Sequence, residues 1–446
     1  MQTETKLSKL EKILDLAKRN GVSQVEVIQK SWTENPINFE NNKLKSLESN
    51  ESSGIAIRVI KNNRIGISSS TDPDITDKTV FSAIEASEFG PEATFKFSQE
   101  KLDQGNTKDD SKPTLPLEDL VERGTNSIEF LRKFHDDLLI SGGFSLGHGE
   151  TLYLNSNGVS GQRKKSVYST SFYAHLVRGE DFLGIYDSKS DLKDFPSETS
   201  ICKKIFEKLN FSREIIPLTT NKYPVIFTPQ AVSNIFGNIL SVLFNGKIIQ
   251  QKISPLADKL DKKIFDEKLS FIEDPDIGIQ MADFDDEGIK TRKKDLIKSG
   301  IVNCFYFDLS SASKMQEVKS VFSSTGNGFK GGLGASPSPS LTNIEIKSGK
   351  TLLKDIIKNM KEGILVDQVL GAGQSNMLAG EFNVGIELGF KIKDGSIQGR
   401  IKNCMVAGNI FEILKNISEI SSDREWIGGS ELLPAFLIEN LTVAGK

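Results

Sequence analysis

The chain has 446 residues, which is too long for one ordinary hydrophobic core, so we expect two domains. Hydrophobic residues make up 37% of the sequence and charged residues 26%, a balance typical of a folded, water-soluble protein rather than a disordered chain or a membrane protein. The 56 basic and 60 acidic residues give a net charge of −4, whereas proteins that bind nucleic acid usually carry a basic excess. The charge balance therefore argues against nucleic acid as a ligand.

The three cysteines, Cys202, Cys304 and Cys404, lie far apart and form no C-x-x-C pair. An odd number of scattered cysteines fits free thiols in a reducing compartment and does not fit a disulfide framework. No signal-peptide region opens the sequence, and no apolar run reaches the roughly 18 residues that a membrane span requires. We expect a cytoplasmic protein that has no contact with a membrane.

The first half of the chain is predicted to combine helices with β-hairpins. Four apolar residues mark one side of a first helix, Leu7, Leu10, Leu14 and Ala17, and Asn20-Gly21 is a suitable end for it. Turn-forming pairs then separate stretches of alternating apolar residues at 41–42, 62–63 and 155–158. Further helices are predicted for 77–88, 117 to about 140, and 198–209. A polar stretch, about 99–116, is predicted to be a surface loop.

The polar stretch 217–222 is the predicted boundary between an N-terminal domain, 1–216, and a C-terminal domain, 217–446. In the second domain, Thr228 is a good N-cap and Pro229 a good first residue for a helix that ends near Gly246. Short strands with glycine turns, such as the turn at 393–395, and a helix at about 352–361 follow. Strands outnumber helices there, so the predicted class is α+β.

Two local motifs are candidate binding sites. The segment Gly326–Gly331 matches G-x-G-x-x-G, but that pattern binds a pyrophosphate only between a strand and a helix, and Pro337 and Pro339 follow. A loop is therefore favoured there over a nucleotide site.

The segment Asp283–Gly288 is rich in carboxylates, which repel one another unless they are solvated, paired with cations or bound to a metal. Three basic residues close by in the sequence could pair with it: Arg292, Lys293 and Lys294. A solvated or ion-paired turn is favoured over a metal site.

Three histidines, His135, His148 and His175, have no His or Cys at metal-ligand spacing. A structural role is favoured for them. A Ser-His-Asp arrangement stays open, although the sequence contains no nucleophile-elbow pattern.

Short segments in a fixed order resemble the TldD/PmbA family, whose members are described as modulators of DNA gyrase and as zinc peptidases. The resemblance spans nearly the whole chain. The segments are Gly54–Val59, Ser68–Thr71, Asp283–Arg292, Leu296–Val302, Ser324–Asn327, Gly363–Val366, Gly380–Gly385, Ala407–Asn409, Leu432–Pro434 and Val443–Gly445.

That family contains two kinds of subunit, and the TldD-like kind holds zinc through His-Glu-x-x-x-His on a helix and a cysteine near the C-terminus. The helix in the equivalent place here, Pro229 to Gly246, contains no His, Glu, Asp or Cys, and no cysteine follows Cys404. The resemblance therefore implies a non-catalytic subunit of the PmbA/TldE kind, with no catalytic residue and no metal ligand of its own. Zinc is expected in the partner.

The partners that the resemblance implies are a TldD-like catalytic subunit and an unfolded peptide, and a homodimer is also considered. Two other hypotheses stay open. The chain could be a hydrolase on its own, with magnesium, calcium or manganese held by Asp283, Asp285, Asp286 or Glu287, or it could bind DNA gyrase directly. Residues expected to line a substrate chamber or to serve a structural role are Asp285, Asp286, Glu287, Gly288, Gly326, Asn327 and Gly380.

Overall fold

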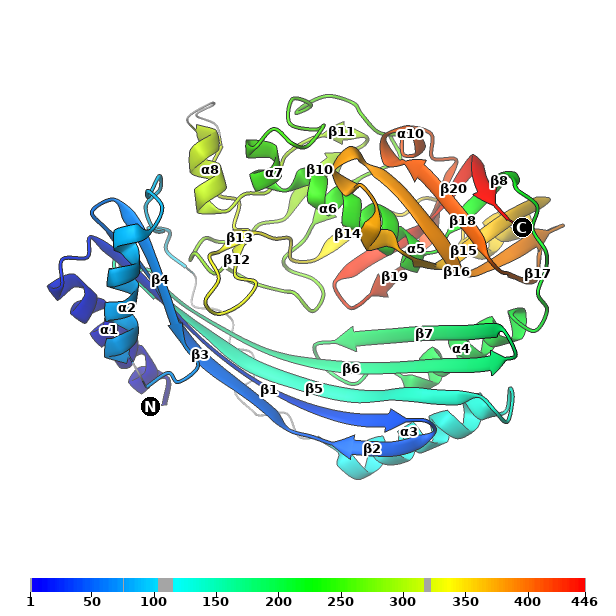
Figure 1. The fold of residues 1–446 in the computed structure, drawn as a ribbon, viewed down its shortest axis with the longest axis horizontal. Coiled ribbons are helices and arrows are strands. Elements are labelled where there is room, and N and C mark those ends of the chain that lie inside the picture. The colour runs from blue at the N-terminus through cyan, green and yellow to red at the C-terminus, as the bar shows by residue number, and fades with distance from the viewer. Residues whose placement is uncertain (1, 75, 103–114, 317–321, 446) are drawn as a thin grey trace.

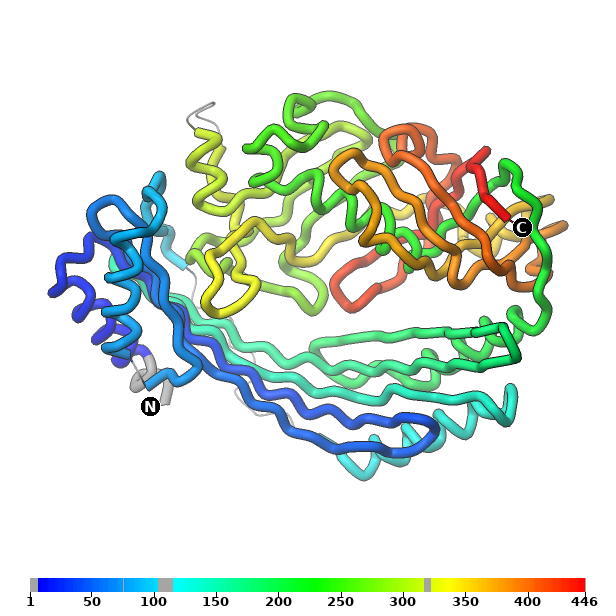
Figure 2. The backbone as a smooth tube through the Cα atoms, viewed as in Figure 1, coloured from blue at the N-terminus to red at the C-terminus, as the bar shows by residue number. Residues whose placement is uncertain are grey.

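The structure is a computed structural model that describes residues 2–74, 76–102, 115–316 and 322–445. Each half of the chain contributes one large β-sheet, and the first sheet bends around the elements of the second half (Figure 1). Helices α1 and α2 lie at one end of the long axis and strand β17 lies at the other (Figure 2). The predicted α+β class is confirmed.

The first sheet has seven antiparallel strands in the order β4-β3-β1-β5-β6-β7, with β2 paired to β1. The predicted asparagine turns are confirmed, because residues 41–42 and 62–63 all adopt the positive φ that tight hairpins require. The strands are β1 (Gln24–Glu40), β2 (Lys43–Leu47), β3 (Asn50–Lys61), β4 (Arg64–Ser70), β5 (Leu139–Asn155), β6 (Ser160–Arg178) and β7 (Asp181–Asp191).

Helices cover the apolar face of this sheet, α1 and α2 at one end and α3 and α4 at the other. Their bounds are α1 (Gln2–Arg19), α2 (Thr76–Phe89), α3 (Leu117–Arg132) and α4 (Glu198–Phe211). The prediction that the third helix runs to about residue 140 is wrong. The chain enters β5 at Leu139 and pairs with β6, so His135 lies in the turn before the strand. The loop predicted at 99–116 lies mostly outside the described residues.

The second sheet has eleven strands of mixed direction, and five of them (β20, β18, β16, β15 and β8) close into a ring through the pairing of β20 with β8. The strands are β8 (Asn221–Phe227), β9 (Phe271–Glu273), β10 (Lys294–Lys298), β11 (Ile301–Val302), β14 (Ile344–Ile346), β15 (Glu362–Leu370), β16 (Glu381–Lys393), β17 (Ser396–Ile401), β18 (Cys404–Asn409), β19 (Glu419–Ile427) and β20 (Glu431–Ala444). A separate hairpin pairs β12 (Gly328–Phe329) with β13 (Ser338–Pro339).

The helix predicted from Pro229 begins as expected, because the Thr228 side chain accepts a hydrogen bond from the Ala231 N–H and proline occupies the first turn. It is not one regular helix. A π-helical segment, η1 (Ser233–Gly237), separates α5 (Pro229–Val232) from α6 (Asn238–Phe244). The end predicted near Gly246 is confirmed, because α6 stops at Phe244 and Asn245 is extended before Gly246 opens α7 (Gly246–Gln250). The remaining helices are α8 (Leu309–Gln316), α9 (Leu353–Lys358), η2 (Ala372–Gln374), η3 (Met377–Ala379) and α10 (Ile410–Ile413).

None of the helices within the described residues has both the length and the apolar character that a membrane span requires.

Candidate functional site

Six of the seven candidate residues lie together where the second half meets the polar face of the first sheet. The backbone joins their two segments: Gly328 N–H donates to Asp285 Oδ2 at 2.8 Å, and Asp286 N–H donates to the Gly328 carbonyl at 3.0 Å. The seventh, Gly380, lies apart from them, between η3 and β16, where its φ of +73° suits the glycine.

The carboxylates of this cluster are buried, so the prediction of a solvated turn is wrong and that of an ion-paired turn is confirmed. Asp285, Asp286 and Glu287 are at most 1% exposed, whereas Asp283 is exposed. Gly288 has a φ of +70°, and a Cβ atom there would lie 2.4 Å from the ring of Tyr153. Only glycine fits this turn against the sheet.

Glu287 shares one guanidinium with a carboxylate of the first sheet. Arg58 donates from Nε to Glu26 Oε1 at 2.7 Å and from Nη2 to Glu287 Oε1 at 3.0 Å. The Leu309 N–H donates to Glu287 Oε2 at 2.7 Å, and the Tyr153 hydroxyl lies 3.0 Å from Glu26 Oε2. Burial outweighs the attraction of Arg58 and raises the pKa of Glu287 to about 7. One guanidinium therefore does not fully neutralise the two carboxylates.

Aromatic rings hold the Arg58 guanidinium in place. Its Cζ atom lies 5.3 Å from the ring centre of Phe95 and 5.0 Å from that of Phe97. Guanidinium groups stack favourably on aromatic faces. The charge is thus fixed from both sides, by carboxylates and by rings.

Asp286 is paired with two cations of the first sheet. Lys30 Nζ and Arg163 Nη2 each donate to its carboxylate at 2.7 Å, and the Lys330 N–H donates at 3.0 Å. Burial would raise the pKa of Asp286, but the charges of Arg163 and Lys30 together hold it below its usual value. Asp286 is therefore a buried anion that links β1 and β6 to the second half.

Asp285 accepts only backbone hydrogen bonds. The N–H groups of Glu287 and Ile289 donate to Oδ1, and that of Gly328 donates to Oδ2, at 2.8 to 2.9 Å. Burial and the nearby Glu287 raise the pKa of Asp285 well above its usual value. Its role is to shape the turn that presents the neighbouring carboxylates.

The three basic residues that we expected to pair with the cluster pair elsewhere. Arg292 contacts Glu100, Lys293 contacts Asp274 and Glu345, and Lys294 contacts Glu273. That expectation is wrong because these side chains pair with carboxylates outside the cluster. The cations that neutralise the cluster come from the other half of the chain.

Asn327 belongs to a second buried network beside the first. Its Nδ2 atom donates to both oxygens of Glu273 at 2.8 and 3.0 Å, and Lys294 Nζ donates to Asn327 Oδ1 at 3.0 Å. Gly326 adopts a φ of +75°, and no helix follows it before Pro339. The segment therefore lacks the strand-to-helix geometry of a nucleotide-binding loop.

Metal binding finds no support in this arrangement. The oxygens of Asp285, Asp286 and Glu287 accept hydrogen bonds from backbone amides or cationic side chains. Across the part of the chain that the structure describes, no group of three His, Cys, Asp or Glu side chains could hold a metal ion. The histidines are spread over the first half, in the turn before β5, on β5 and on β6.

Five first-half residues of the cluster were missed in the sequence: Glu26, Lys30, Arg58, Tyr153 and Arg163. A signal existed for two of them. Glu26 and Arg58 are single charged residues within apolar strand segments, at 3% and 4% exposure, and a charged residue is seldom buried unless it is paired.

In contrast to the charged cluster, the helix at 229–244 is packed against apolar side chains. Phe236 lies at the centre, with ring centres 5.2 Å from Phe227, 5.8 Å from Phe382 and 5.7 Å from Phe436. The helix thereby anchors to three of the strands that form the closed ring. No side chain of these residues is a ligand for a transition metal.

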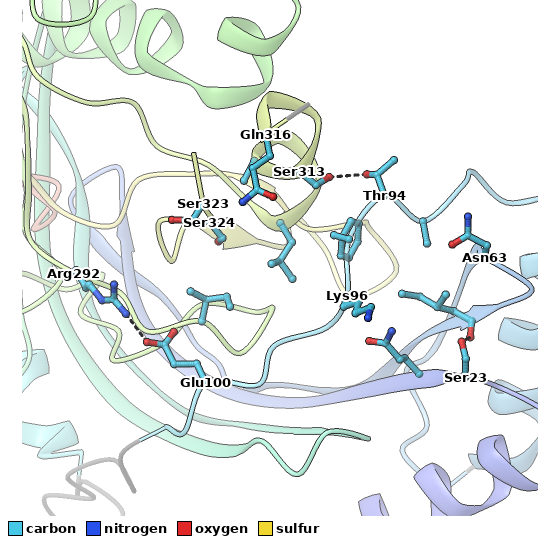
Figure 3. Close-up of a pocket in the computed structure, with 17 residues that line it drawn as sticks. Ser23, Asn63, Thr94, Lys96, Glu100, Arg292, Ser313, Gln316, Ser323 and Ser324 are labelled. Carbon is cyan, nitrogen blue, oxygen red and sulfur yellow. Dashed lines mark hydrogen bonds and ion pairs between the residues drawn. The ribbon is translucent and has the colours of Figure 1, made fainter. Parts of the chain in front are cut away.

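A pocket of about 690 Å³ lies between the two halves of the chain (Figure 3). Its polar lining includes Lys96 and Ser324, an ion pair between Arg292 and Glu100, and a 2.6 Å hydrogen bond between the hydroxyls of Thr94 and Ser313. Residues of both halves form the wall, so the pocket depends on how the halves dock.

Comparison with known families gives two matches. The PmbA/TldA metallopeptidase C-terminal domain matches residues 220–445, which is just over half of the chain. The PmbA/TldA metallopeptidase domain 1 matches residues 25–89, within the first sheet and α2.

Individual relatives agree with these matches. An uncharacterized protein of Methanocaldococcus jannaschii is 26% identical over 91% of this chain and 93% of its own length. The metalloprotease PmbA of Escherichia coli O157:H7 is 30% identical over 50% of this chain, but the alignment spans only 46% of that protein. The crystal structure of TldE from Thermococcus kodakarensis superposes with a TM-score of 0.88 at 24% identity, covering 98% of this chain and 100% of that one. This last likeness is one of fold.

Proposed function

Because the chain belongs to the PmbA/TldD metallopeptidase family, we propose that it is the non-catalytic, PmbA/TldE-like subunit of a cytoplasmic zinc metallopeptidase. In this proposal a TldD-like partner supplies the zinc and the chemistry, and the complex cleaves unfolded or modified peptides. This chain shapes the chamber in which the peptide is held.

One observation carries the proposal. The helix at 229–244 offers no imidazole, thiolate or carboxylate, and phenylalanines fill the space around Phe236. A zinc peptidase needs three protein ligands and a group that accepts a proton from the metal-bound water. Neither the ligands nor the proton acceptor can come from this helix.

The carboxylate cluster supports a structural role for the motif at 285–288. Asp286 and Glu287 are held by cations of the first sheet, and these bonds tie the two halves together. A hydrolase that used these groups as metal ligands would first have to break buried ion pairs, which costs several kcal/mol. The cluster thus supports a fixed wall between the halves, not a second catalytic centre.

The test is reconstitution from separately purified proteins. Zinc is quantified in this chain, in a TldD-like protein from the same cell, and in their mixture, and hydrolysis of fluorescein-labelled unfolded casein is measured in each. We expect substoichiometric zinc and no hydrolysis for this chain alone, and chelator-sensitive hydrolysis in the mixture. Chelator-sensitive hydrolysis by this chain alone would contradict the proposal.

Asp286→Asn tests the alternative that this chain is itself a hydrolase with a metal held by the carboxylates. If the carboxylates held a catalytic metal, the substitution would lower the metal content of the isolated chain together with any activity. We expect both to be unchanged from the wild-type chain, and the substitution to lower stability instead.

A further inference from the structure

Four basic side chains meet on the polar face of the first sheet, beside Asp286. Lys30 of β1 and Arg163 of β6 reach the Asp286 carboxylate from the two strands that flank β5. Lys165 lies two positions after Arg163 and therefore on the same face of β6. Lys330 belongs to the second half, and its N–H donates to the same Asp286 oxygen as the Lys30 ammonium.

Lys165 has no acidic partner within the described residues. Its Nζ atom donates to the Ile279 carbonyl at 2.8 Å. Burial lowers the pKa of Lys165 to about 8, and the positive charges of Arg163 and Lys30 act in the same direction. Glu34, the next acid on this face of β1, is not among the groups that shift this pKa. The ammonium group of Lys165 therefore has cations as its charged neighbours.

Lys330 is in a similar position. Burial lowers its pKa to about 8, and Arg58 and Lys30 act in the same direction. Glu26 and Asp286 act in the opposite direction. These two carboxylates already pair with Arg58 and Lys30, so Lys330 has no acid of its own within the described residues.

The positive charge around Asp286 thus exceeds the negative charge. Lys30, Arg163, Lys165 and Lys330 approach it, and Asp286 supplies a single negative charge. Like charges held close together in a partly desolvated place destabilise the folded state. Because Lys30 acts on both of the other lysines, the three ammonium groups form one cluster that an anion would stabilise.

The cluster is open to a ligand. The Lys30 side chain is 35% exposed, and Lys165 and Lys330 are partly exposed. Each ammonium has three donors, and each makes one hydrogen bond within the described residues. A Cβ atom on Gly331 or Gly332 would meet no atom within 4 Å, so the segment after Lys330 borders open space.

An aromatic surface adjoins the lysines. Trp32 and Lys165 are both opposite Gly149 of β5. A Cβ atom on Gly149 would lie 2.6 Å from the Trp32 ring, and one on Gly147 would lie 2.3 Å from it, so the partly exposed ring rests on both glycines. Apolar surface therefore lies next to the positive charge.

We propose that Lys30, Lys165 and Lys330 bind a carboxylate group, with the Trp32 ring against the aliphatic part that carries it. A carboxylate offers acceptors to ammonium donors, and charge-assisted hydrogen bonds of this kind are among the strong ones. Resting on the proposed function, the inference assigns the carboxylate to the bound peptide, either as its C-terminus or as an acidic side chain.

The experiment measures binding of three matched probes to the full chain by ligand-observed NMR at pH 7. Nα-acetyl-glutamine carries only the terminal carboxylate, Nα-acetyl-glutamate methylamide carries only the side-chain carboxylate, and Nα-acetyl-glutamine methylamide carries neither. We expect one carboxylate probe to bind at least about tenfold more tightly than the uncharged probe. The carboxylate probe that binds more tightly identifies the source of the group.

Lys165→Met and Lys330→Met keep most of the side-chain stem and remove the charge, and we expect each to abolish most of this preference. Lys164→Met, at an exposed position on the opposite face of β6, should leave it unchanged. The two site variants are independent, so loss of folding in one leaves the other to decide.

Three outcomes overturn the proposal: equal binding of all three probes, failure of both carboxylate probes to bind, or an unaltered preference in a folded site variant. Inorganic phosphate serves as a fourth probe. Binding of phosphate without a preference for either carboxylate probe would assign the cluster to a phosphoryl ligand and would also overturn it.

The pH dependence of the preference separates this cluster from ordinary surface lysines. Lys165 and Lys330 lose their protons near pH 8, whereas exposed lysines keep them to about pH 10.4. The charged groups that face these two lysines are Arg163, Lys30, Arg58, Glu26 and Asp286. The preference should therefore weaken between pH 7 and pH 9, and a constant preference over this range would contradict the assignment.

The probes need no partner subunit. Failure of this binding test leaves the reconstitution result standing, and failure of reconstitution leaves the binding result standing.

Discussion

Two buried regions, the carboxylate cluster at 285–288 and the helix at 229–244, are built in opposite ways. In the cluster, the buried carboxylates of Asp286 and Glu287 are paired with cations from the other half of the chain. In the helix, phenylalanines pack on strands of the same half. Ionic contacts demand defined partners and geometry, whereas apolar packing is governed mainly by shape and volume. The cluster therefore adds specific ionic contacts between the halves, which also share an apolar core around α3 and α4, and the helix stabilises one half.

The largest loss of stability should come from Arg58→Met, which breaks the ion pairs of the cluster. The substitution keeps much of the apolar stem but leaves Glu26 and Glu287 buried without their shared cation, so we expect a loss of about 5 kcal/mol. Urea titration of the free energy of unfolding measures it.

Lys263→Met is the control for this prediction, because its pair with Glu267 is exposed and should contribute less than about 1 kcal/mol. A loss for Arg58→Met as small as that of the control would mean that the buried pairs do not hold the halves together.

The next largest effect should come from Phe236→Ala in the helix. Removing a buried phenylalanine costs transfer free energy and leaves a cavity, so we expect a loss of about 4 kcal/mol, within the range for such substitutions. Phe236→Leu, which keeps much of the volume, should cost about 1 kcal/mol.

The two variants should also differ in which half of the chain exchanges its amide hydrogens faster. Hydrogen exchange should show the Phe236→Ala change confined to strands of the second sheet, and the Arg58→Met change on both sides of the junction. Exchange in the first sheet of Phe236→Ala as strong as in the second would contradict the distinction.

The smallest effect is a pH dependence of stability, to which the cluster should contribute and the helix should not. Since the folded chain raises the pKa of Glu287 to about 7, it holds a proton that the unfolded chain releases near the ordinary glutamate value. The stability from this group is complete below the unfolded pKa and is lost as pH rises through about 7, with a slope of up to about 1.4 kcal/mol per pH unit.

Thermal unfolding of Glu287→Gln from pH 5 to pH 8 measures this contribution. The variant should flatten the dependence that the wild-type chain shows, while Glu267→Gln at an exposed site should keep it. Parallel wild-type and Glu287→Gln curves would show that Glu287 does not titrate in this range.

Elements whose conformation depends on residues close in the sequence were predicted correctly. The turns at 41–42 and 62–63 and the start of the helix at Thr228 follow from side-chain and backbone preferences within a few residues. The end of α3 was predicted wrongly because its C-terminal extension has helix-forming residues whose conformation is decided by the pairing of β5 with β1 and β6.

By itself, the sequence determined the α+β class, the resemblance to a peptidase family, and the absence of zinc ligands on one helix, since composition and local motifs are readable without knowing what packs where. Only the tertiary structure decided that the carboxylates are buried and which cations meet them. Lys30 and Asp286 are 256 positions apart, and their contact exists only because the second half docks on the polar face of the first sheet. Ion pairing at such separation depends on the packing of whole sheets, which no local pattern encodes.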